Sequence, residues 1–514
     1  YNFANNGGAG SITNQGTLTA AQSGYIALLA PEVMNDGIIS ATLGKAVLAA
    51  GDQVTLNLSQ DSLLGFNIDK GAFKALADNK QLIEANGGQV FMSAKAADAI
   101  TTAMVNNTGI IEASTMQMVN GTVQMVSGRI ELMSDMQVGT VNVGGILDAS
   151  APNGGDGGFI ETSAAHVQIA DDAKVTTLAA AGQNGTWLID PPVDFTIAAS
   201  GGNMTGTVLA SSLALNDVTI VSTTSAVPGV GNINVNDEVT WSANKLTLNA
   251  QNNININADM NASATASLAL EYGQSAALSG NNSLITTTGA VVNLPAGTSN
   301  FTTRQGSDGL TKNYTVITSL GIEGSLYSHT DLQGMWGEGT NYALGANIDA
   351  TDTVNWNSGA GFTPIWGNAG RNFKGSFDGL GHTISNLYIS RPVIRPQSDF
   401  IGLFGLFNLA NGSSISNLEL LEVDMTGNTA VGALAGKVEN TGGVAGVDSG
   451  RINNVLVSGS VTGKTSHIGG LVGQAVDTTI SNSYSKVNVN GAAYTGGLLG
   501  SLYSVNYGSN ISNS

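Results

Sequence analysis

The sequence predicts an all-β fold in the form of an elongated parallel β-helix, a solenoid of stacked coils. Composition is the first observation behind this prediction: 68 of 514 residues are glycine and only 11% are charged. Abundant glycine weakens helices and few charges remain to solubilise helix faces, so an ordinary helical or α/β enzyme is not expected. The second observation is a short internal repeat. The third is the absence of cysteine, which excludes disulfide bonds and thiol catalysis and leaves stability to an extensive core.

The excess of acidic over basic residues argues against nucleic acid as a partner. Acidic residues number 37 and basic residues 18, which gives a formal net charge of −19. Phosphate groups are bound by clustered Lys and Arg, so we expect no nucleic acid partner. The 42% of hydrophobic residues argue against intrinsic disorder. Because the chain begins at Tyr1, inside a patterned segment, we expect a fragment or a processed product.

The first third of the chain repeats with a period of about 20 residues, which is typical of one β-helical coil. A single coil cannot bury its own apolar face, whereas stacked coils bury a continuous column. Glycine and asparagine are expected at the corners because sharp bends there need a positive φ. The strand-like runs that open with glycine are Gly16-Thr-Leu-Thr-Ala20, Gly37-Ile-Ile-Ser-Ala41, Gly109-Ile-Ile-Glu-Ala113, Gly128-Arg-Ile-Glu-Leu132 and Gly145-Ile-Leu-Asp-Ala149.

Residues 69–86 interrupt this pattern. Phe73, Leu76, Leu82 and Ile83 are spaced roughly as on one face of a helix. We therefore expect a short helical or loop protrusion near residues 69–86, on the outside of the solenoid. It would serve as a recognition element or as a lid over one face of the β-helix.

Further along, residues 252–257 alternate asparagine with Ile254 and Ile256. This period of two places the isoleucines on the inner face and the asparagines outside, where their amides would stack as ladders.

The last third carries a second repeat, with a period of about 30 residues. Each unit would supply two or three short strands separated by turns. Its apolar motif occurs as Ile401-Gly-Leu-Phe-Gly405, Val431-Gly-Ala-Leu-Ala-Gly436, Ile468-Gly-Gly-Leu-Val-Gly473 and Thr495-Gly-Gly-Leu-Leu-Gly500. Between copies lies Ile-x-Asn, which ends at Asn386, Asn417, Asn454, Asn482 and Asn513.

Several of these segments resemble known families. Residues 24–41 and 47–56 resemble the repeats of filamentous-haemagglutinin-like exoproteins exported by two-partner secretion, and Gly185-Thr-Trp-Leu-Ile-Asp-Pro191 resembles a junction in large adhesins of that group. The Gly-x-Leu-x-Gly units, introduced by residues 373–384, resemble GLUG repeats. With the resemblance, the chain divides into haemagglutinin-type repeats (1–190), continuing β-helix or linking repeats (191–330) and a GLUG-repeat β-helix (331–514).

The resemblance implies a right-handed β-helix in a secreted or cell-surface adhesin. Such a protein is a rigid stalk that attaches to cells, surfaces or biofilm matrix, and an outer-membrane secretion partner assists its export. Its ligands would be cell-surface or matrix glycans or proteins, and lateral self-association is also expected. With coils of about 21 residues stacked about 4.8 Å apart, the stalk would measure about 115 Å. Two alternatives stay open: a polysaccharide-cleaving β-helix enzyme, and the stalk of a contact-dependent toxin-delivery exoprotein.

Two clusters of residues are candidates for chemistry. Asp378 and His382, with Asp349 or Asp352 from a stacked coil, would shuttle protons, but a tight turn at Asp378-Gly379 followed by a strand explains them more simply. Residues 154–158 hold one carboxylate among four glycines, too few charged ligands for calcium, so a turn is favoured. We therefore assign no catalytic, cofactor-binding or metal-binding residue and expect neither an enzyme nor a bound cofactor.

The aromatic residues offer one further candidate. Trp336, Trp356 and Trp366 lie within about 30 residues of one another. Exposed, they would stack on sugar rings beside asparagine amides; buried, they would plug a core whose cross-section changes. The plug is the favoured interpretation.

Overall fold

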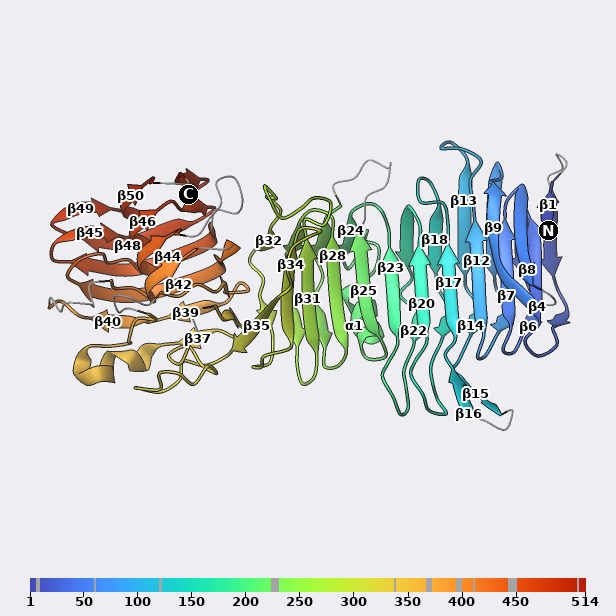
Figure 1. Ribbon diagram of the computed structural model, residues 1–514, viewed down its shortest axis with the longest axis horizontal. Coiled ribbons are helices and arrows are strands. Elements are labelled where there is room, and N and C mark those ends of the chain that lie inside the picture. The colour runs from blue at the N-terminus through green and yellow to red at the C-terminus, as the bar shows by residue number, and fades with distance from the viewer. Residues whose placement is uncertain are drawn as a thin grey trace. The chain divides into compact units, whose positions relative to one another are not determined.

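The computed structural model describes residues 1–5, 10–59, 62–119, 123–222, 231–336, 339–366, 372–393, 400–409, 412–441, 451–505 and 508–514. This part of the chain is nearly all β, and most of its strands pair in parallel (Figure 1). The all-β prediction is confirmed. The chain forms two compact units, unit 1 (residues 1–255 and 268–275) and unit 2 (residues 256–267 and 276–514).

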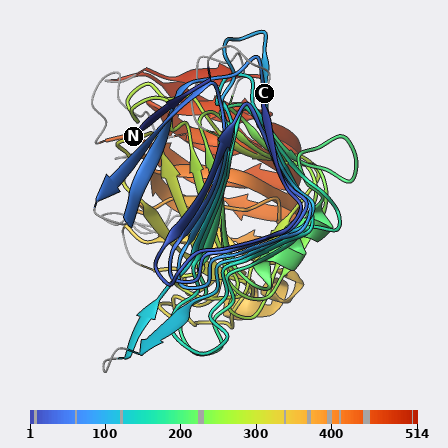
Figure 2. The same cartoon turned by 90° about the vertical axis from the view of Figure 1, so that its right-hand side faces the viewer.

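In three parallel sheets of unit 1, strands pair with their counterparts from neighbouring coils (Figure 2). The first sheet holds β2 (Ser11–Asn14), β5 (Glu32–Asn35), β10 (Lys74–Asn79), β13 (Thr102–Asn107), β18 (Thr140–Val143) and β21 (His166–Ile169). The second holds β3 (Thr17–Thr19), β6 (Ile38–Ser40), β11 (Leu82–Glu84), β14 (Ile110–Glu112), β19 (Ile146–Asp148) and β22 (Lys174–Thr176). The third includes β4 (Tyr25–Ala30), β7 (Lys45–Ala50), β12 (Gln89–Ala94), β17 (Arg129–Met133), β20 (Phe159–Ser163), β23 (Thr186–Asp190), β25 (Asp217–Ser222) and β28 (Lys245–Ala250).

In-register pairing turns the repeated apolar positions into buried columns. In the second sheet Ile39 pairs with Ile83, Ile83 with Ile111 and Ile111 with Leu147, and all four are fully buried. Ile39, Ile111 and Leu147 are the second apolar residues of glycine-led runs, so at these positions the repeat in the sequence marks the core directly.

Glycine at the head of two of these runs has a different cause from the one expected. Neither Gly37 nor Gly109 has a positive φ. A Cβ at Gly37 would lie 2.2 Å from the Gly16 carbonyl oxygen, and a Cβ at Gly109 would lie 2.2 Å from that of Gln81. Close approach of the stacked backbones therefore requires glycine at both positions.

A ladder of asparagine amides runs through the interior of unit 1. The Nδ2 group of Asn14 donates to Oδ1 of Asn35, Asn35 to Asn79, and Asn79 to Asn107, each at 2.8 Å. The last Nδ2 donates to the Gly144 carbonyl oxygen at 2.8 Å. Asn35, Asn79 and Asn107 are fully buried, so the ladder satisfies polar groups that burial would otherwise penalise.

The helical or loop protrusion predicted at residues 69–86 is wrong. This segment enters the first two sheets as β10 and β11, where Ala75 and Ala77 face the core and Phe73 is exposed. Parallel partners on both sides decide the conformation, because β10 pairs with both β5 and β13. The apolar spacing that looked helical reflects strand residues on opposite faces.

Other segments of unit 1 lie outside the three sheets. An antiparallel outer layer of β1 (Asn2–Ala4), β8 (Gln53–Ser59) and β9 (Ser62–Lys70) packs on the third sheet through an apolar cluster that includes Val54, Leu56 and Ile68. The hairpin of β15 (Met116–Val119) and β16 (Val123–Val126) projects away from the sheets (Figure 1). The helix α1 (Gly206–Leu213) is capped at its N-terminus by Thr205, whose side-chain oxygen accepts a hydrogen bond from the Val208 amide.

Toward the end of unit 1, β24 (Phe195–Ile197) pairs in parallel with β26 (Ile233–Val235). Ile254 and Ile256 of β29 (Ile254–Ile256) are fully buried, and Asn255 between them donates to Asn234 at 2.8 Å. The predicted alternation and the outer amide stacking are both confirmed here.

Unit 2 stacks its strands in the same manner. One sheet holds β41 (Phe404–Asn408), β43 (Ala435–Glu439), β46 (Val472–Val476) and β50 (Leu499–Tyr503), all paired in parallel. Each of these strands begins at the last two residues of a Gly-x-Leu-x-Gly motif. A second run of paired strands includes β38 (Phe377–Asp378), β39 (Thr383–Ser385), β40 (Tyr388–Ser390), β42 (Ser414–Gly427), β44 (Arg451–Gly463), β47 (Thr479–Ser481), β48 (Tyr484–Asn490) and β51 (Asn510–Ser512). A 3-10 helix spans Thr351–Gly359.

The Ile-x-Asn motifs of unit 2 form its corners. The five asparagines have φ values of 59°, 53°, 56°, 49° and 51° in chain order, all in the left-handed region. The use of asparagine at sharp bends, which the sequence predicted for the 20-residue repeat, is found at every copy of this second motif. The five residues are Asn386, Asn417, Asn454, Asn482 and Asn513.

Candidate functional site

The structure separates Asp378 from His382, the pair weighed as a proton shuttle. Asp378 is buried and accepts bonds from the Leu380 amide at 2.9 Å and from Asn417 at 3.1 Å. His382 is also buried, and its ring nitrogens contact Asn347 Oδ1 at 3.1 Å and the Val292 carbonyl oxygen at 3.0 Å. Burial raises the pKa of the Asp378 carboxyl and lowers that of the His382 imidazole. Both groups therefore serve the turn and the strand stacking around them.

The acidic residues expected from the stacked coil take no part in this pair. Asp349 accepts bonds from Thr351 and from Asn386 at 3.1 Å, and these hydrogen bonds lower the pKa of its carboxyl. Asp352 lies exposed in the first turn of the 3-10 helix.

The glycine-rich segment 154–158 follows a turn at residues 152–153 and includes a bend at Gly154 and an antiparallel bridge from Gly155 to Ala181. Gly154 and Gly155 have φ values of 103° and 83°. The one carboxylate, Asp156, accepts a bond from the Gln183 amide at 2.9 Å. Across the residues that the structure describes, no three His, Asp or Glu side chains gather closely enough to hold a metal ion.

The tryptophans belong to the core of unit 2, as the plug interpretation predicted. Trp356 and Trp366 are 8% and 9% exposed, and Trp336 packs against the same cluster. The Trp336 and Trp366 rings stack with their centroids 4.3 Å apart, and Tyr327 meets Trp336 edge to face at 4.0 Å. A sugar-binding platform built on these three rings is therefore wrong.

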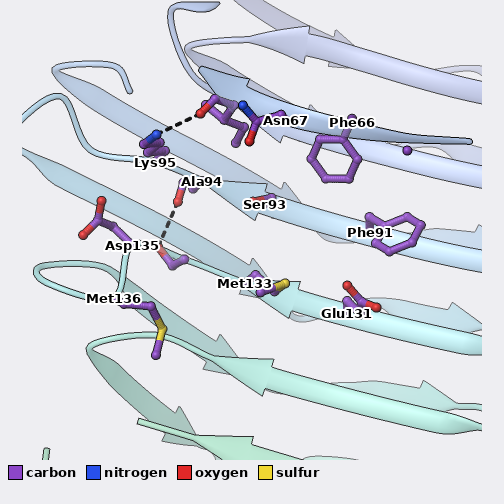
Figure 3. Close-up of a pocket in the computed structure, with 13 residues that line it drawn as sticks. Phe66, Asn67, Phe91, Ser93, Ala94, Lys95, Glu131, Met133, Asp135 and Met136 are labelled. Atoms are coloured by element: carbon purple, nitrogen blue, oxygen red, sulfur yellow. Dashed lines mark hydrogen bonds between the residues drawn. The ribbon is translucent and has the colours of Figure 1, made fainter. Parts of the chain in front are cut away.

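A hollow in unit 1 lies where the outer layer ends on the third sheet (Figure 3). We call it the hairpin groove, after the antiparallel pair of β8 and β9 in that outer layer. Its volume is about 460 Å³, within the usual range for ligand pockets. Phe66 of β9 and Phe91 of β12 meet edge to face at 5.7 Å. Figure 3 shows Glu131 beside these rings, whereas Lys95 and Asp135 lie toward the other end.

Two lysines donate hydrogen bonds to carbonyl oxygens of β9 near the hairpin groove. Lys45 Nζ donates to the Leu64 carbonyl oxygen and Lys95 Nζ to that of Ile68, both at 2.9 Å. Burial lowers the pKa of Lys45, consistent with a side chain that runs under the outer layer.

A carboxylate column continues from the hairpin groove across the third sheet. Glu131 pairs in register with Glu161, and Arg129 contacts both carboxylates. The Arg129 guanidinium also lies 4.2 Å from the centre of the Phe159 ring. Burial raises the pKa of the Glu161 carboxyl, and the nearby Glu131 carboxylate adds to the effect.

A second hollow, here called the asparagine groove, lies in unit 2 and measures about 340 Å³. Thr287 and residues 289–291 line it together with residues of β42, β44 and β48. Asn417, Asn454 and Asn482, three of the motif corners, are among its lining residues, together with Glu419 and Tyr484. The sequence marked the corners but gave no sign that residues 287–291 lie against them.

Comparisons with known proteins give short similarities to two much longer proteins. Over 142 residues the chain is 37% identical to halomucin of Haloquadratum walsbyi. The aligned region is 27% of this chain and 1% of halomucin. Over 171 residues it is 32% identical to the immunoglobulin A1 protease of Streptococcus sanguinis, which covers 32% of this chain and 8% of the protease. Both relatives are large extracellular proteins. No family model matches the chain.

The chain spans less than a tenth of each relative. Among the residues described by the structure, no helix is long and apolar enough to cross a membrane.

Proposed function

We propose that this chain is part of a secreted or cell-surface structural adhesin, with its stacked strands forming the rungs of a right-handed parallel β-helix. The observation that carries the proposal is the in-register stacking of successive coils in both units, with aliphatic columns and an amide ladder inside. Such a body is rigid because each rung is fixed by its neighbours, which suits a stalk that presents a binding surface. The similarity to two large extracellular proteins supports secretion.

Small-angle scattering and an attachment assay test this proposal together. We expect the purified chain to scatter as a rod and to bind, when coated on beads, to cells or to extracellular matrix. Beads coated with an unrelated acidic protein of similar net charge control for electrostatic adsorption. A compact particle would contradict the stalk, and beads that attach to no cell or matrix surface would contradict the adhesin.

One observation favours a second function, cleavage of a polysaccharide. The stacked Glu131 and Glu161 carboxylates next to Arg129 are the arrangement that such an enzyme would place on one face of its sheet. Two neighbouring carboxylates, one with a raised pKa, would provide an acid and a base. Incubation with a panel of glycans, followed by measurement of new reducing ends, tests this function. Activity that disappears in Glu161→Gln would favour the enzyme, and no release from any glycan would leave the adhesin.

A further inference from the structure

We propose that the asparagine groove of unit 2 is a binding site for neutral oligosaccharides. The inference rests on the proposed adhesin function and names the ligand class and the site. It draws on three properties of the groove: the direction of its amide ladder, an exposed tyrosine ring two strands away from a free carboxylate, and the absence of positive charge among its lining residues.

The amide ladder at the corners has a fixed direction. Asn417 Nδ2 donates to the buried Asp378 carboxylate at 3.1 Å, and Asn417 Oδ1 accepts from Asn454 Nδ2 at 2.9 Å. Asn454 Nδ2 also donates to the Thr287 carbonyl oxygen at 3.2 Å. The donors of Asn454 are thus used within the protein, and its Oδ1 is left as an acceptor at the groove.

Asn482, at the next corner, also keeps an amide oxygen to which no described residue donates, although its Nδ2 group donates to a different partner. Asn482 Nδ2 donates to Asn453 Oδ1 at 2.9 Å instead of continuing the ladder to Asn454. Within the described ranges, Oδ1 of Asn454 and Oδ1 of Asn482 accept no hydrogen bond from the protein. Asn454 and Asn482, from consecutive coils, both line the groove, and each keeps an amide oxygen that the described part of the protein does not use.

Beside the corners, strand pairing sets a second column. Glu419 of β42 pairs with Leu456 of β44, and Leu456 pairs with Tyr484 of β48. Tyr484 is 52% exposed. In the part of the chain covered by the structure, the Glu419 carboxylate forms no ion pair or hydrogen bond. The column thus offers an aromatic face and a carboxylate to a ligand, with aliphatic Leu456 between them.

These groups match the chemistry of a neutral sugar. Sugar hydroxyls donate hydrogen bonds, and the groove offers acceptors from Asn454, Asn482 and Glu419. The apolar face of a sugar ring packs on an aromatic side chain such as Tyr484. None of the groove's lining residues is Lys or Arg, so a sulfated or carboxylated sugar would meet Glu419 without a compensating cation. Pockets of about 300 Å³ and above accommodate small ligands.

The experiment is a glycan array, followed by titration of the bound glycans, with the full chain and three single variants. Tyr484→Ala removes the ring, and Glu419→Gln removes the charge but keeps an acceptor oxygen. Asn482→Gly removes the amide but retains a residue that tolerates the left-handed backbone. Asn386→Gly is the matched control, because Asn386 occupies an equivalent corner with φ 59° and does not line the groove.

We expect neutral glycans to bind, and Tyr484→Ala to weaken binding about tenfold, as expected for loss of a main aromatic contact. Asn482→Gly should weaken binding less, and Asn386→Gly should leave it unchanged. Thermal unfolding of each variant separates loss of binding from loss of fold. Binding confined to acidic or cationic ligands would overturn the inference, and so would neutral-glycan binding that all three groove variants retain.

The same variants distinguish this inference from the adhesin proposal. If coated beads attach to cells equally well with wild type and Tyr484→Ala, the groove is not the attachment site and the adhesin proposal stands. If the wild-type chain binds neutral glycans on the array but its beads attach to no surface, the groove stands and the adhesin proposal fails.

Discussion

Asparagines stack from coil to coil in both units, but unit 1 buries them and unit 2 places them at corners. In unit 1 the ladder of Asn35, Asn79 and Asn107 lies fully inside, and each amide both donates to and accepts from its neighbours or the backbone. In unit 2 the corner asparagines adopt a left-handed backbone, and two of them leave an acceptor at the groove.

The difference shows two separate reasons for the same residue type. Inside unit 1 asparagine is required for its side chain, because a buried amide is stable only when all its partners are present. At the corners of unit 2 it is required for its backbone, because asparagine tolerates a positive φ better than other residues with a Cβ. Alanine and glycine substitutions of asparagine should therefore rank differently in the two units.

The largest effect is expected from Asn79→Ala. This change leaves Asn35 Nδ2 and Asn107 Oδ1 short of partners in a fully buried site, at about 1–3 kcal/mol for each unsatisfied group. We expect a loss of about 3 kcal/mol in the free energy of unfolding of unit 1. Urea unfolding followed by hydrogen exchange of unit 1 amides measures it.

The control for this prediction is Asn142→Ala. Asn142 donates to Asn106 at 2.7 Å in a partly buried pair on the outer face of the first sheet. Water replaces this partner, so the loss should stay below about 1 kcal/mol. Equal losses for the two variants would show that burial does not distinguish the inner ladder.

Sequence reasoning reached the corners and the aliphatic columns because both are local properties of a repeat. Positive φ depends on one residue and its neighbours, and every Ile-x-Asn copy confirmed it. The inner ladder escaped notice because its members are 21, 44 and 28 residues apart. The outer layer, with β8 and β9 inserted between coils, destroys the regular spacing that would have revealed it.

The asparagine groove was hidden by distance along the chain. Asn454 contacts the Thr287 carbonyl oxygen across 167 residues, and no periodicity connects residues so far apart. The prediction of a helical or loop protrusion at residues 69–86 was wrong for a related reason. Their partners in neighbouring coils, β5 and β13, override the helical spacing of Phe73, Leu76 and Ile83.

The next effect in size concerns the corner backbone and compares Asn386→Ala with Asn386→Gly. Asn386 is exposed, with φ 59°. Alanine in the left-handed region costs about 1–2 kcal/mol, whereas glycine enters it without strain. We expect the midpoint of thermal unfolding to fall more for Asn386→Ala than for Asn386→Gly. At Asn79 glycine should be no better than alanine, and the same ranking at both sites would remove the distinction between the units.

The smallest effect tests the outer face of unit 1, where side chains stack without forming hydrogen bonds to one another. Glu84, Glu112 and Asp148 pair in register. Burial raises the pKa of the Glu112 carboxyl, and the Asp148 and Glu84 carboxylates add to it. The amides of a ladder attract one another through hydrogen bonds, whereas the stacked carboxylates of this column repel one another.

The sign of the pH dependence follows from that direction. A folded-state pKa above the unfolded value means that ionised Glu112 destabilises the fold at neutral pH, and that the penalty disappears as pH falls below the unfolded pKa. Glu112→Gln should therefore raise the unfolding midpoint slightly at pH 7 and leave it unchanged near pH 3. High salt should reduce the gain at pH 7, because it screens part of the repulsion between these partly buried carboxylates. A loss of stability at pH 7 would mean that Glu112 contributes a favourable interaction in the fold, and the carboxylate column would then resemble the amide ladders after all.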